Sequence, residues 1–309
     1  MRTAILGGTG SIGVATAARL AQAGEAVTIL SRRPSAALPA GVEWRHVDVT
    51  DAESVRAALA EGDVVRVAHL AALLQFACEG DPAEAVRVNV DGVLNVLAAS
   101  RDLDIRRVVF GSSIALYGER SDAMRETDPV PADVSLYGMT KRLGEMLGER
   151  FRSSDGLEFV ALRYSGVFGP GAATSPGMAQ VRQRILQCAR GEDVVVEGAG
   201  GDERIHLTYV SDAAEATCRA LLGAAPAHSI YNVAGPAENH VSLRELHRLV
   251  CEIAPGAGRA IWSGRARSAG LVDTTRIAGD LGWTPAVSVK EGLRQLLAPE
   301  QRAAAREVA

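Results

Sequence analysis

The chain has 309 residues, of which 47% are hydrophobic and 23% are charged, as in most water-soluble globular proteins. Its net charge of −4 disfavours a nucleic-acid-binding surface, which requires a basic face. No apolar run approaches the roughly 18 residues that a membrane-spanning helix needs, and the N-terminus has no apolar signal region. These features predict a cytoplasmic protein without nucleic-acid or membrane partners.

The four cysteines are widely spaced and form no CxxC pair. Such spacing is typical of buried thiols in a reducing compartment, and it predicts neither a disulfide framework nor a metal site. The basic residues carry a sharper signal. Of the 33 Lys and Arg residues, only Lys141 and Lys290 are lysines, so each of these two positions calls for a reason.

Short β-rich runs alternate with helical patterns through the first half of the chain. We predict helices at Ile12–Ala23, Ala52–Ala60, Pro82–Arg101 and Leu136–Phe151. We predict strands at Thr3–Leu6, Ala26–Leu30, Val42–Val49, Val64–His69, Arg107–Phe110 and Phe159–Tyr164. This alternation predicts an α/β fold of the Rossmann type, a doubly wound parallel sheet with helices on both faces.

After about residue 165 the alternation loosens. We predict a helix at Met178–Arg190 and a short strand at Val194–Val196, and Ser-x-x-Glu patterns at Ser242 and Ser288 are typical helix starts. We therefore expect a nucleotide-binding domain over residues 1–165 and a small substrate-binding lobe over 166–297, interleaved with that domain. Residues 298–309 are expected to form a frayed tail.

The first predicted strand runs into a glycine-rich turn that fits both the G-x-x-G-x-x-G and the G-x-G-x-x-G spacing of nucleotide-binding loops. Glycines allow a tight turn, close approach of the backbone to a pyrophosphate, and close packing of helix on strand. The N-terminus of the following helix supplies free N–H groups. Because the turn lies at the first strand–helix junction, it predicts a dinucleotide site. Its residues are Gly7, Gly8, Gly10, Ser11, Ile12 and Gly13.

The second predicted strand ends in Ser31, Arg32 and Arg33, with no carboxylate. An NAD site usually places Asp or Glu there to accept from the ribose 2′-hydroxyl, whereas guanidinium groups bind a 2′-phosphate with several donors. The sequence therefore favours NADP(H), with NAD(H) as the alternative. Residues at the ends of the third and fourth strands complete the expected cofactor site: Asp48, Val49, Leu70, Ala71 and Ala72.

Tyr137 and Lys141 lie one helical turn apart on one face of a predicted helix. A tyrosine with its usual pKa near 10 is a poor base at neutral pH, and an adjacent ammonium group favours the phenolate. Ser112 and Ser113 end the preceding strand and face the same cleft. We expect Ser113 to hold a substrate oxygen and Ser112 to act as a second donor to the substrate.

Further motifs accompany this pair: His69–Leu73, Val88–Val90, Leu162–Tyr164, Tyr209–Asp212, Tyr231–Val233 and Leu281–Pro285. From Thr3 to about Leu297 the chain thereby resembles the extended short-chain dehydrogenase/reductases, the NAD-dependent epimerase/dehydratase family. The resemblance implies that Tyr137 is the catalytic base and that Lys141 activates it and clamps the cofactor. It also implies that Ser113 steadies the reacting oxygen and that Asn89 supports the site.

The resemblance further implies a homodimer, formed through the helices predicted at Pro82–Arg101 and Leu136–Phe151. Apolar residues on these helices suit either such an interface or packing on the sheet: Val86, Val90, Val93, Leu94, Leu97, Leu143, Met146 and Leu147.

The chain also departs from the nucleotide-sugar enzymes of the family. These usually carry Asn where this chain has Gly166, and that Asn helps to hold the nucleotide phosphates. The segment His69–Leu74, together with Ser112–Ile114 and Arg163–Gly166, also resembles short-chain L-threonine dehydrogenases. Arg204 is a candidate for binding a substrate phosphate or carboxylate. Ile114 and Ala115 occupy the place of the Asp–Glu pair of the family's 4,6-dehydratases, so dehydration is disfavoured.

The function favoured by the sequence is an NAD(P)-dependent oxidoreductase or epimerase that acts on a secondary alcohol or ketone, most readily a nucleotide-activated sugar. The alternative is a dehydrogenase or reductase of a small hydroxy or keto compound, such as a sugar acid, an amino acid or a natural-product ketone. Gly166 supports this alternative. A more distant alternative is a non-catalytic nucleotide-sensing protein. It is disfavoured because the chain retains both Tyr137 and Lys141.

Overall fold

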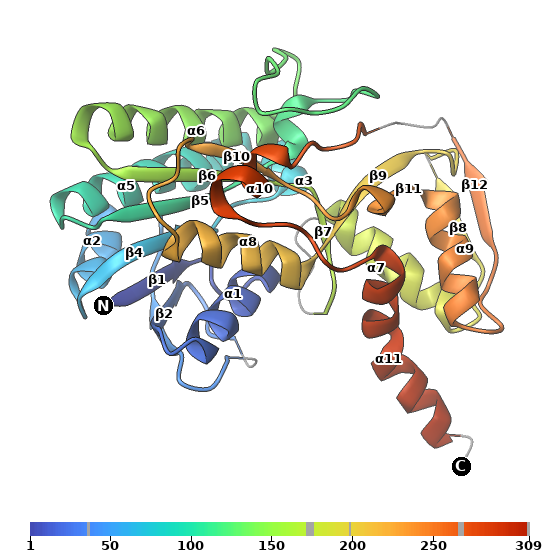
Figure 1. The fold of residues 1–309 in the computed structure, drawn as a ribbon. Helices are drawn as coiled ribbons and strands as arrows, with labels where there is room; N and C mark the ends of the chain where they lie inside the picture. The colour runs from blue at the N-terminus through green and yellow to red at the C-terminus, as the bar shows by residue number, and fades with distance from the viewer. Residues whose placement is uncertain (36–37, 171–175, 198, 265–268, 308–309) are drawn as a thin grey trace.

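Seven parallel strands form one sheet in the order β10-β6-β5-β4-β1-β2-β3 (Figure 1). The computed structural model describes residues 1–35, 38–170, 176–197, 199–264 and 269–307. Because the strand order reverses between β1 and β4, a crevice lies at the carboxyl ends of these strands. The predicted doubly wound α/β fold is confirmed. The strands are β1 (Arg2–Leu6), β2 (Ala26–Ser31), β3 (Glu43–His46), β4 (Val64–His69), β5 (Arg107–Ser113), β6 (Glu158–Tyr164) and β10 (Ile230–Val233).

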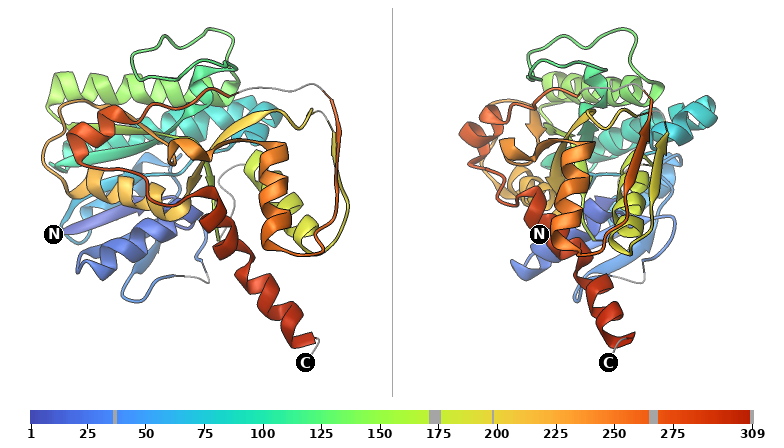
Figure 2. Two further views of the ribbon diagram at one scale, coloured as in Figure 1. Left: turned by 45° about the vertical axis from the view of Figure 1, so that its right-hand side comes forward. Right: turned by 90° about the vertical axis from the view of Figure 1, so that its right-hand side faces the viewer.

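Helices cover both faces of the sheet (Figures 1 and 2). On one face α1 (Ser11–Gln22) packs against α8 (Val210–Leu222). On the other face α5 (Gly92–Asp102) lies between α2 (Ala52–Ala60) and α6 (Leu136–Asp155). Separate apolar clusters fill the two sides of the sheet, so each face of the sheet has its own hydrophobic core.

The helix predicted at Pro82–Arg101 is interrupted. It consists of α4 (Pro82–Val86), a π-helical turn η1 (Arg87–Asp91) and α5, and a short helix α3 (Gln75–Gly80) precedes it. A π turn inserts one extra residue into the helical repeat and is often found at functional sites. Apolar periodicity does not reveal such a local widening, so the continuous helix predicted from the sequence is wrong at this point.

The second half of the chain builds a lobe beside the main sheet (Figure 2). A three-stranded sheet joins β7 (Gly166–Phe168), β9 (Arg204–Tyr209) and β11 (His240–Ser242), and a two-stranded sheet joins β8 (Val194–Glu197) and β12 (Ala260–Ser263). Strand β10 and helix α8 return to the main sheet. The other elements are η2 (Ile114–Tyr117), α7 (Pro176–Ala189), η3 (Ala237–Asn239), α9 (Leu243–Ile253), α10 (Thr275–Leu281) and α11 (Val289–Glu307).

Several predicted element boundaries differ in the structure. The capping box predicted at Ser242 is complete, whereas at Ser288 only the bond from the Glu291 N–H to the serine hydroxyl forms. Strand β3 is shorter than predicted, and α11 continues to Glu307, where a frayed tail was expected from residue 298. The tail is rich in Ala, Arg and Glu, which are good helix formers. None of the helices in the described ranges is long and apolar enough to cross a membrane.

Helix α6 lies unusually close to the sheet. A Cβ atom added at Gly144 would lie 2.7 Å from the ring of Phe110, and one added at Gly148 would lie 2.1 Å from the ring of Phe159. Both rings belong to the sheet strands under the helix. The glycines therefore let the axis of α6 approach β5 and β6 more closely than any side chain would permit.

We predict that Gly148→Ala destabilises the protein by about 1–3 kcal/mol, because the added methyl group overpacks the contact with Phe159. Gly279 in α10 is the matched control, since nothing lies within 4 Å of a Cβ added there. Gly279→Ala should be neutral or stabilising by up to about 1 kcal/mol through helix propensity. Urea unfolding measures both values. Equal stability of Gly148→Ala and the wild type would contradict the close approach of α6.

Candidate functional site

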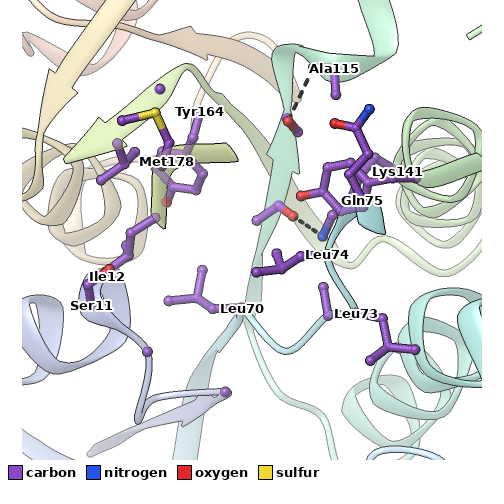
Figure 3. Close-up of a pocket in the computed structure, with 18 of the residues that line it drawn as sticks. Ser11, Ile12, Leu70, Leu73, Leu74, Gln75, Ala115, Lys141, Tyr164 and Met178 are labelled. Atoms are coloured by element: carbon purple, nitrogen blue, oxygen red, sulfur yellow. Dashed lines mark hydrogen bonds between the residues drawn. The ribbon is translucent and has the colours of Figure 1, made fainter. Parts of the chain in front are cut away.

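A cleft of about 970 Å³ lies at the carboxyl ends of the parallel strands and extends into the lobe. Figure 3 shows residues on its two sides: Gln75 of α3 and Lys141 of α6 on one side, and Ile12 of α1, Tyr164 at the end of β6 and Met178 of α7 on the other. The crevice at the strand-order reversal therefore continues as one cavity between the sheet and the lobe.

The glycine turn forms one wall of the cleft. Gly7 has a φ of +73°, and a Cβ added there would lie 2.4 Å from the backbone nitrogen of Ala71, so only glycine fits. Gly8 and Gly13 pack on each other at the strand–helix contact, and Gly8 does not line the cleft. Gly10 is the N-cap of α1 and makes no side-chain capping bond. The first N–H groups of α1 are therefore available to an anion.

The end of β2 presents basic side chains to the cleft. Ser31 accepts a hydrogen bond from Trp44 Nε1 at 2.9 Å and donates one to the carbonyl of Arg33 at 2.7 Å, which fixes the turn after the strand. Arg32 and Arg33 are exposed and line the cleft. Asp48 lines it nearby, and its pKa is lowered by hydrogen bonds from the backbone and side chain of Thr50 and by the charge of Arg32.

The segment after β4 lies along the base of the cleft, where Leu70, Ala71 and Ala72 line it together with Val49. Asn89, in the π turn, lies beneath this segment rather than in the cleft lining. Its side chain accepts from the N–H of Leu73 at 2.7 Å and donates to the Leu73 carbonyl at 2.9 Å. Asn89 therefore holds the base of the cleft in place.

Tyr137, Lys141 and Ser113 meet in the middle of the cleft. The Lys141 ammonium is buried and donates to the carbonyl of Gly111 at 2.6 Å (Figure 3). Burial lowers the pKa of Lys141 to about 8. Burial raises the pKa of Tyr137 to about 12, although its hydrogen bond with Ser113 opposes that effect. At neutral pH the pair is therefore a phenol beside an ammonium group, with the serine hydroxyl close to the phenol.

Not all of the predicted substrate-binding residues line the cleft. Ser112 and Gly166 line the cleft, whereas Arg204 does not. Its chain neighbours Glu203, Ile205 and His206 do line the cleft. The side chain of Arg204 instead lies 3.5 Å from the Glu245 carboxylate and donates to the His240 carbonyl. The sequence alone indicates neither strand β9 nor the contacts with Glu245 and His240 that hold Arg204 outside the cleft.

Other residues on the lobe side were missed by sequence reasoning. Arg184 from α7 and Glu197 from β8 line the cleft, and no ion pair of either one is present among the residues that the structure describes. Gly166 is closely packed, because an added Cβ would lie 3.2 Å from the His206 carbonyl and 3.3 Å from the sulfur of Met178. An asparagine side chain at this position would have to displace these atoms.

Metal ligation is not evident in the described ranges, where no group of three or more His, Cys, Asp or Glu side chains could hold a metal ion. All four cysteines are free thiols; Cys251 is exposed and the other three are buried.

Comparison with known proteins places the chain among enzymes. The model of the "NAD dependent epimerase/dehydratase family" matches residues 3–234. A UDP-glucuronate 4-epimerase of Thermodesulfobacterium geofontis is 24% identical over 259 residues, which cover 82% of this chain and 77% of that protein. A mitochondrial L-threonine 3-dehydrogenase of Sus scrofa is 28% identical over 242 residues, which cover 75% of this chain and 64% of that protein.

The fold is likewise that of solved epimerases. The structure of UDP-glucose 4-epimerase of Thermus thermophilus in complex with NAD superposes with a TM-score of 0.87 and 28% sequence identity. The superposition covers 98% of this chain and 100% of that one. The chain is therefore an enzyme of the NAD dependent epimerase/dehydratase family.

Proposed function

We propose that the protein interconverts a secondary alcohol and a ketone by hydride transfer with a nicotinamide cofactor, and that its substrate is a nucleotide-activated sugar. The observation that carries this proposal is the meeting of Tyr137, Lys141 and Ser113 in the cleft between the glycine turn and the lobe. The similarity to UDP-sugar 4-epimerases supports the substrate class.

The residues around the glycine turn fit a dinucleotide. The backbone of Gly7 approaches Ala71 in a way that no side chain would allow, and the uncapped start of α1 offers N–H groups to a pyrophosphate. A bound nicotinamide would accept a hydride at its C4 carbon and return it.

The chain's own residues handle the proton and the oxygen. Ser113 holds the substrate oxygen, and Tyr137 takes the hydroxyl proton when the carbon is oxidised and gives it back when the carbonyl is reduced. Lys141 carries a positive charge below its pKa of about 8, and this charge favours the phenolate that accepts the proton. An epimerase releases an alcohol inverted at the reacting carbon, whereas a dehydrogenase releases the ketone.

A second candidate substrate is a small hydroxy or keto compound. Gly166 supports it, since the asparagine that holds nucleotide phosphates in the resembling enzymes would have to displace neighbouring atoms here. The likeness to L-threonine 3-dehydrogenase supports it as well. For either class, Arg184 is the lobe-side cation that we assign to an anionic group of the substrate, in place of Arg204.

The test incubates the purified protein with each nicotinamide cofactor and a panel of both substrate classes. We expect interconversion of a nucleotide-activated sugar without net change at the nicotinamide absorbance band. Net absorbance change with a small hydroxy compound would instead support the second candidate. If every substrate in the panel were left unchanged, or if Tyr137→Phe retained full activity, the proposed chemistry would be wrong.

The two lysines provide a matched pair for testing the mechanism. We predict that Lys141→Arg lowers kcat by at least about 100-fold, because a wide planar guanidinium cannot replace the compact ammonium beside Tyr137. Lys290 is partly exposed and pairs with Glu252 at 2.8 Å. Lys290→Arg should keep the activity of the wild type. Steady-state kinetics measures kcat for both variants. Equal kcat values for Lys141→Arg and Lys290→Arg would refute the role of Lys141.

The cofactor that we propose is NADP(H), with NAD(H) as the alternative. The support is the pair Arg32 and Arg33 at the cleft, without a carboxylate at the end of β2. The double variant Arg32→Ala/Arg33→Ala should raise the Kd for NADPH by about 10–100-fold, since charged hydrogen bonds to the 2′-phosphate are lost. The Kd for NADH should stay unchanged. Fluorescence titration measures both constants, and tighter binding of NADH than NADPH by the wild type would reverse the assignment.

We also propose a homodimer through the helices around residues 82–102 and 136–155. Val93 and Leu97 are buried in the core, but other apolar residues of these helices are exposed to solvent. The two helical segments are adjacent, so their exposed side chains can meet the same surface of a second copy across a two-fold axis. The exposed residues are Val86, Leu94, Met139, Leu143 and Met146.

Light scattering tests the dimer. We predict a dimer for the wild type at micromolar concentration and a monomer for the double variant Leu94→Glu/Met146→Glu, because buried carboxylates in the interface are strongly unfavourable. Val195→Glu is the control, since Val195 is also an exposed apolar residue but lies on β8 in the lobe. A monomeric wild type would contradict the proposal.

A further inference from the structure

Three successive turns of α6 contact the end of β5. Tyr137 lies beside Ser113, the ammonium of Lys141 donates to the Gly111 carbonyl at 2.6 Å, and Glu145 accepts from the Ser112 hydroxyl at 2.7 Å. The helix residues are spaced by four, so they share one face of α6. Glu145 therefore lies on the same face of α6 as Tyr137 and Lys141, one turn further along the helix.

Glu145 is completely buried, and both oxygens of its carboxylate accept hydrogen bonds. Its carboxylate accepts two hydrogen bonds from Arg163 of β6, from Nε and from Nη2, each at 2.7 Å. Arg142 lies at 3.2 Å from the same carboxylate. A two-pronged arginine contact of this kind fixes the direction of both groups.

Arg163 extends the network away from the cleft. Its Nη1 donates to the hydroxyl of Tyr117 at 2.7 Å, and that hydroxyl donates to Asn232 of β10 at 2.8 Å. Asn232 in turn donates to the carbonyls of Met124 and Asp273. The carboxylate of Glu145 is thereby held from a rigid part of the sheet rather than from the cleft itself.

We propose that Glu145 is a positioning residue for the reaction: it holds Ser112, and with it the end of β5, against α6, and it keeps the ammonium of Lys141 charged. This inference rests on the proposed function for its kinetic consequence only. The contacts that carry it belong to α6, β5 and β6 and need no bound ligand.

The charge environment of Lys141 supports the second part of the proposal. The titratable groups that face it are His69 of β4, Cys78 of α3, and Tyr137 and Glu145 on its own helix. Burial lowers the pKa of His69 to about 3 and raises the pKa of the Cys78 thiol, so both are neutral near pH 7. Among these groups, Glu145 is the one that brings a negative charge, and the guanidinium groups of Arg163 and Arg142 bring positive charges to the same carboxylate.

The same two strands offer a matched control at their other end. Arg107 of β5 is buried and pairs with Glu158 of β6 at 2.6 Å, just as Arg163 pairs with Glu145. Arg107 and Glu158 are register partners at the start of the strands, whereas Ser112 and Arg163 are register partners at their end. Glu158→Gln therefore removes an arginine-paired carboxylate, although a partly exposed one, without touching the cleft.

The test uses the scarcity of lysine. In protein labelled with ¹⁵N-lysine only two side-chain ammonium signals exist, those of Lys141 and Lys290, and NMR follows each with pH. In Glu145→Gln the pKa of Lys141 should fall by about one unit or more below its wild-type value, because a nearby negative charge is lost. It should be unchanged in Glu158→Gln, and Lys290 should be unchanged in both.

Kinetics provide the second readout, measured with the substrate identified for the wild type. Glu145→Gln should lower kcat by about 10-fold or more and leave KM near that of the wild type, whereas Glu158→Gln should leave both unchanged. If Glu145→Gln does not fold by circular dichroism, the double variant Glu145→Gln/Arg163→Gln, which removes both charges of the buried pair, is measured in its place with the same expectation for kcat.

An unchanged Lys141 pKa in Glu145→Gln, or kinetics that match those of Glu158→Gln, would overturn the inference. The NMR titration is made without substrate or cofactor. An inactive wild type with the expected shift would therefore count against the proposed function alone and still support the electrostatic part of the inference.

Discussion

The hydrogen bond from the ammonium of Lys141 to the carbonyl of Gly111 is the constraint on which the rest of the site depends. A buried ammonium group requires an acceptor within hydrogen-bond distance, so α6 must lie close to the end of β5. Gly144 and Gly148 permit this approach, because side chains there would collide with the phenylalanine rings of the sheet. The same approach brings Tyr137 to Ser113. The packing of α6 and the chemistry of the cleft therefore have one geometric cause.

The two sides of the cleft serve different purposes. The sheet side is built from tight backbone contacts, such as that of Gly7 with Ala71, and leaves little freedom for variation. The lobe side is built from side chains on separate elements, among them Arg184 of α7 and Glu197 of β8.

Much of the site could be predicted from the sequence where the signal is local. The glycine turn and the pair Tyr137–Lys141 each lie within a few residues of chain, and their spacing alone places them at a strand–helix junction and on one helix face. Glu145 and Arg163 are 18 residues apart and meet only because α6 packs across β6, which no local pattern indicates. The position of Arg204 depends on the register of β9, an element that its short run of mixed residues did not reveal. The π turn around Asn89 likewise follows from tertiary contacts with Leu73 rather than from periodicity.

A crystal structure of the protein with NADP⁺ and a nucleotide-activated sugar is the decisive test of the proposed mechanism. In that structure we expect a substrate oxygen within hydrogen-bond distance of both the Ser113 and the Tyr137 hydroxyls. We also expect the pyrophosphate of the cofactor to lie on the turn from Gly7 to Gly13, with its nicotinamide ribose beside Lys141. A substrate oxygen held by other groups, or a cofactor bound away from this turn, would contradict the mechanism.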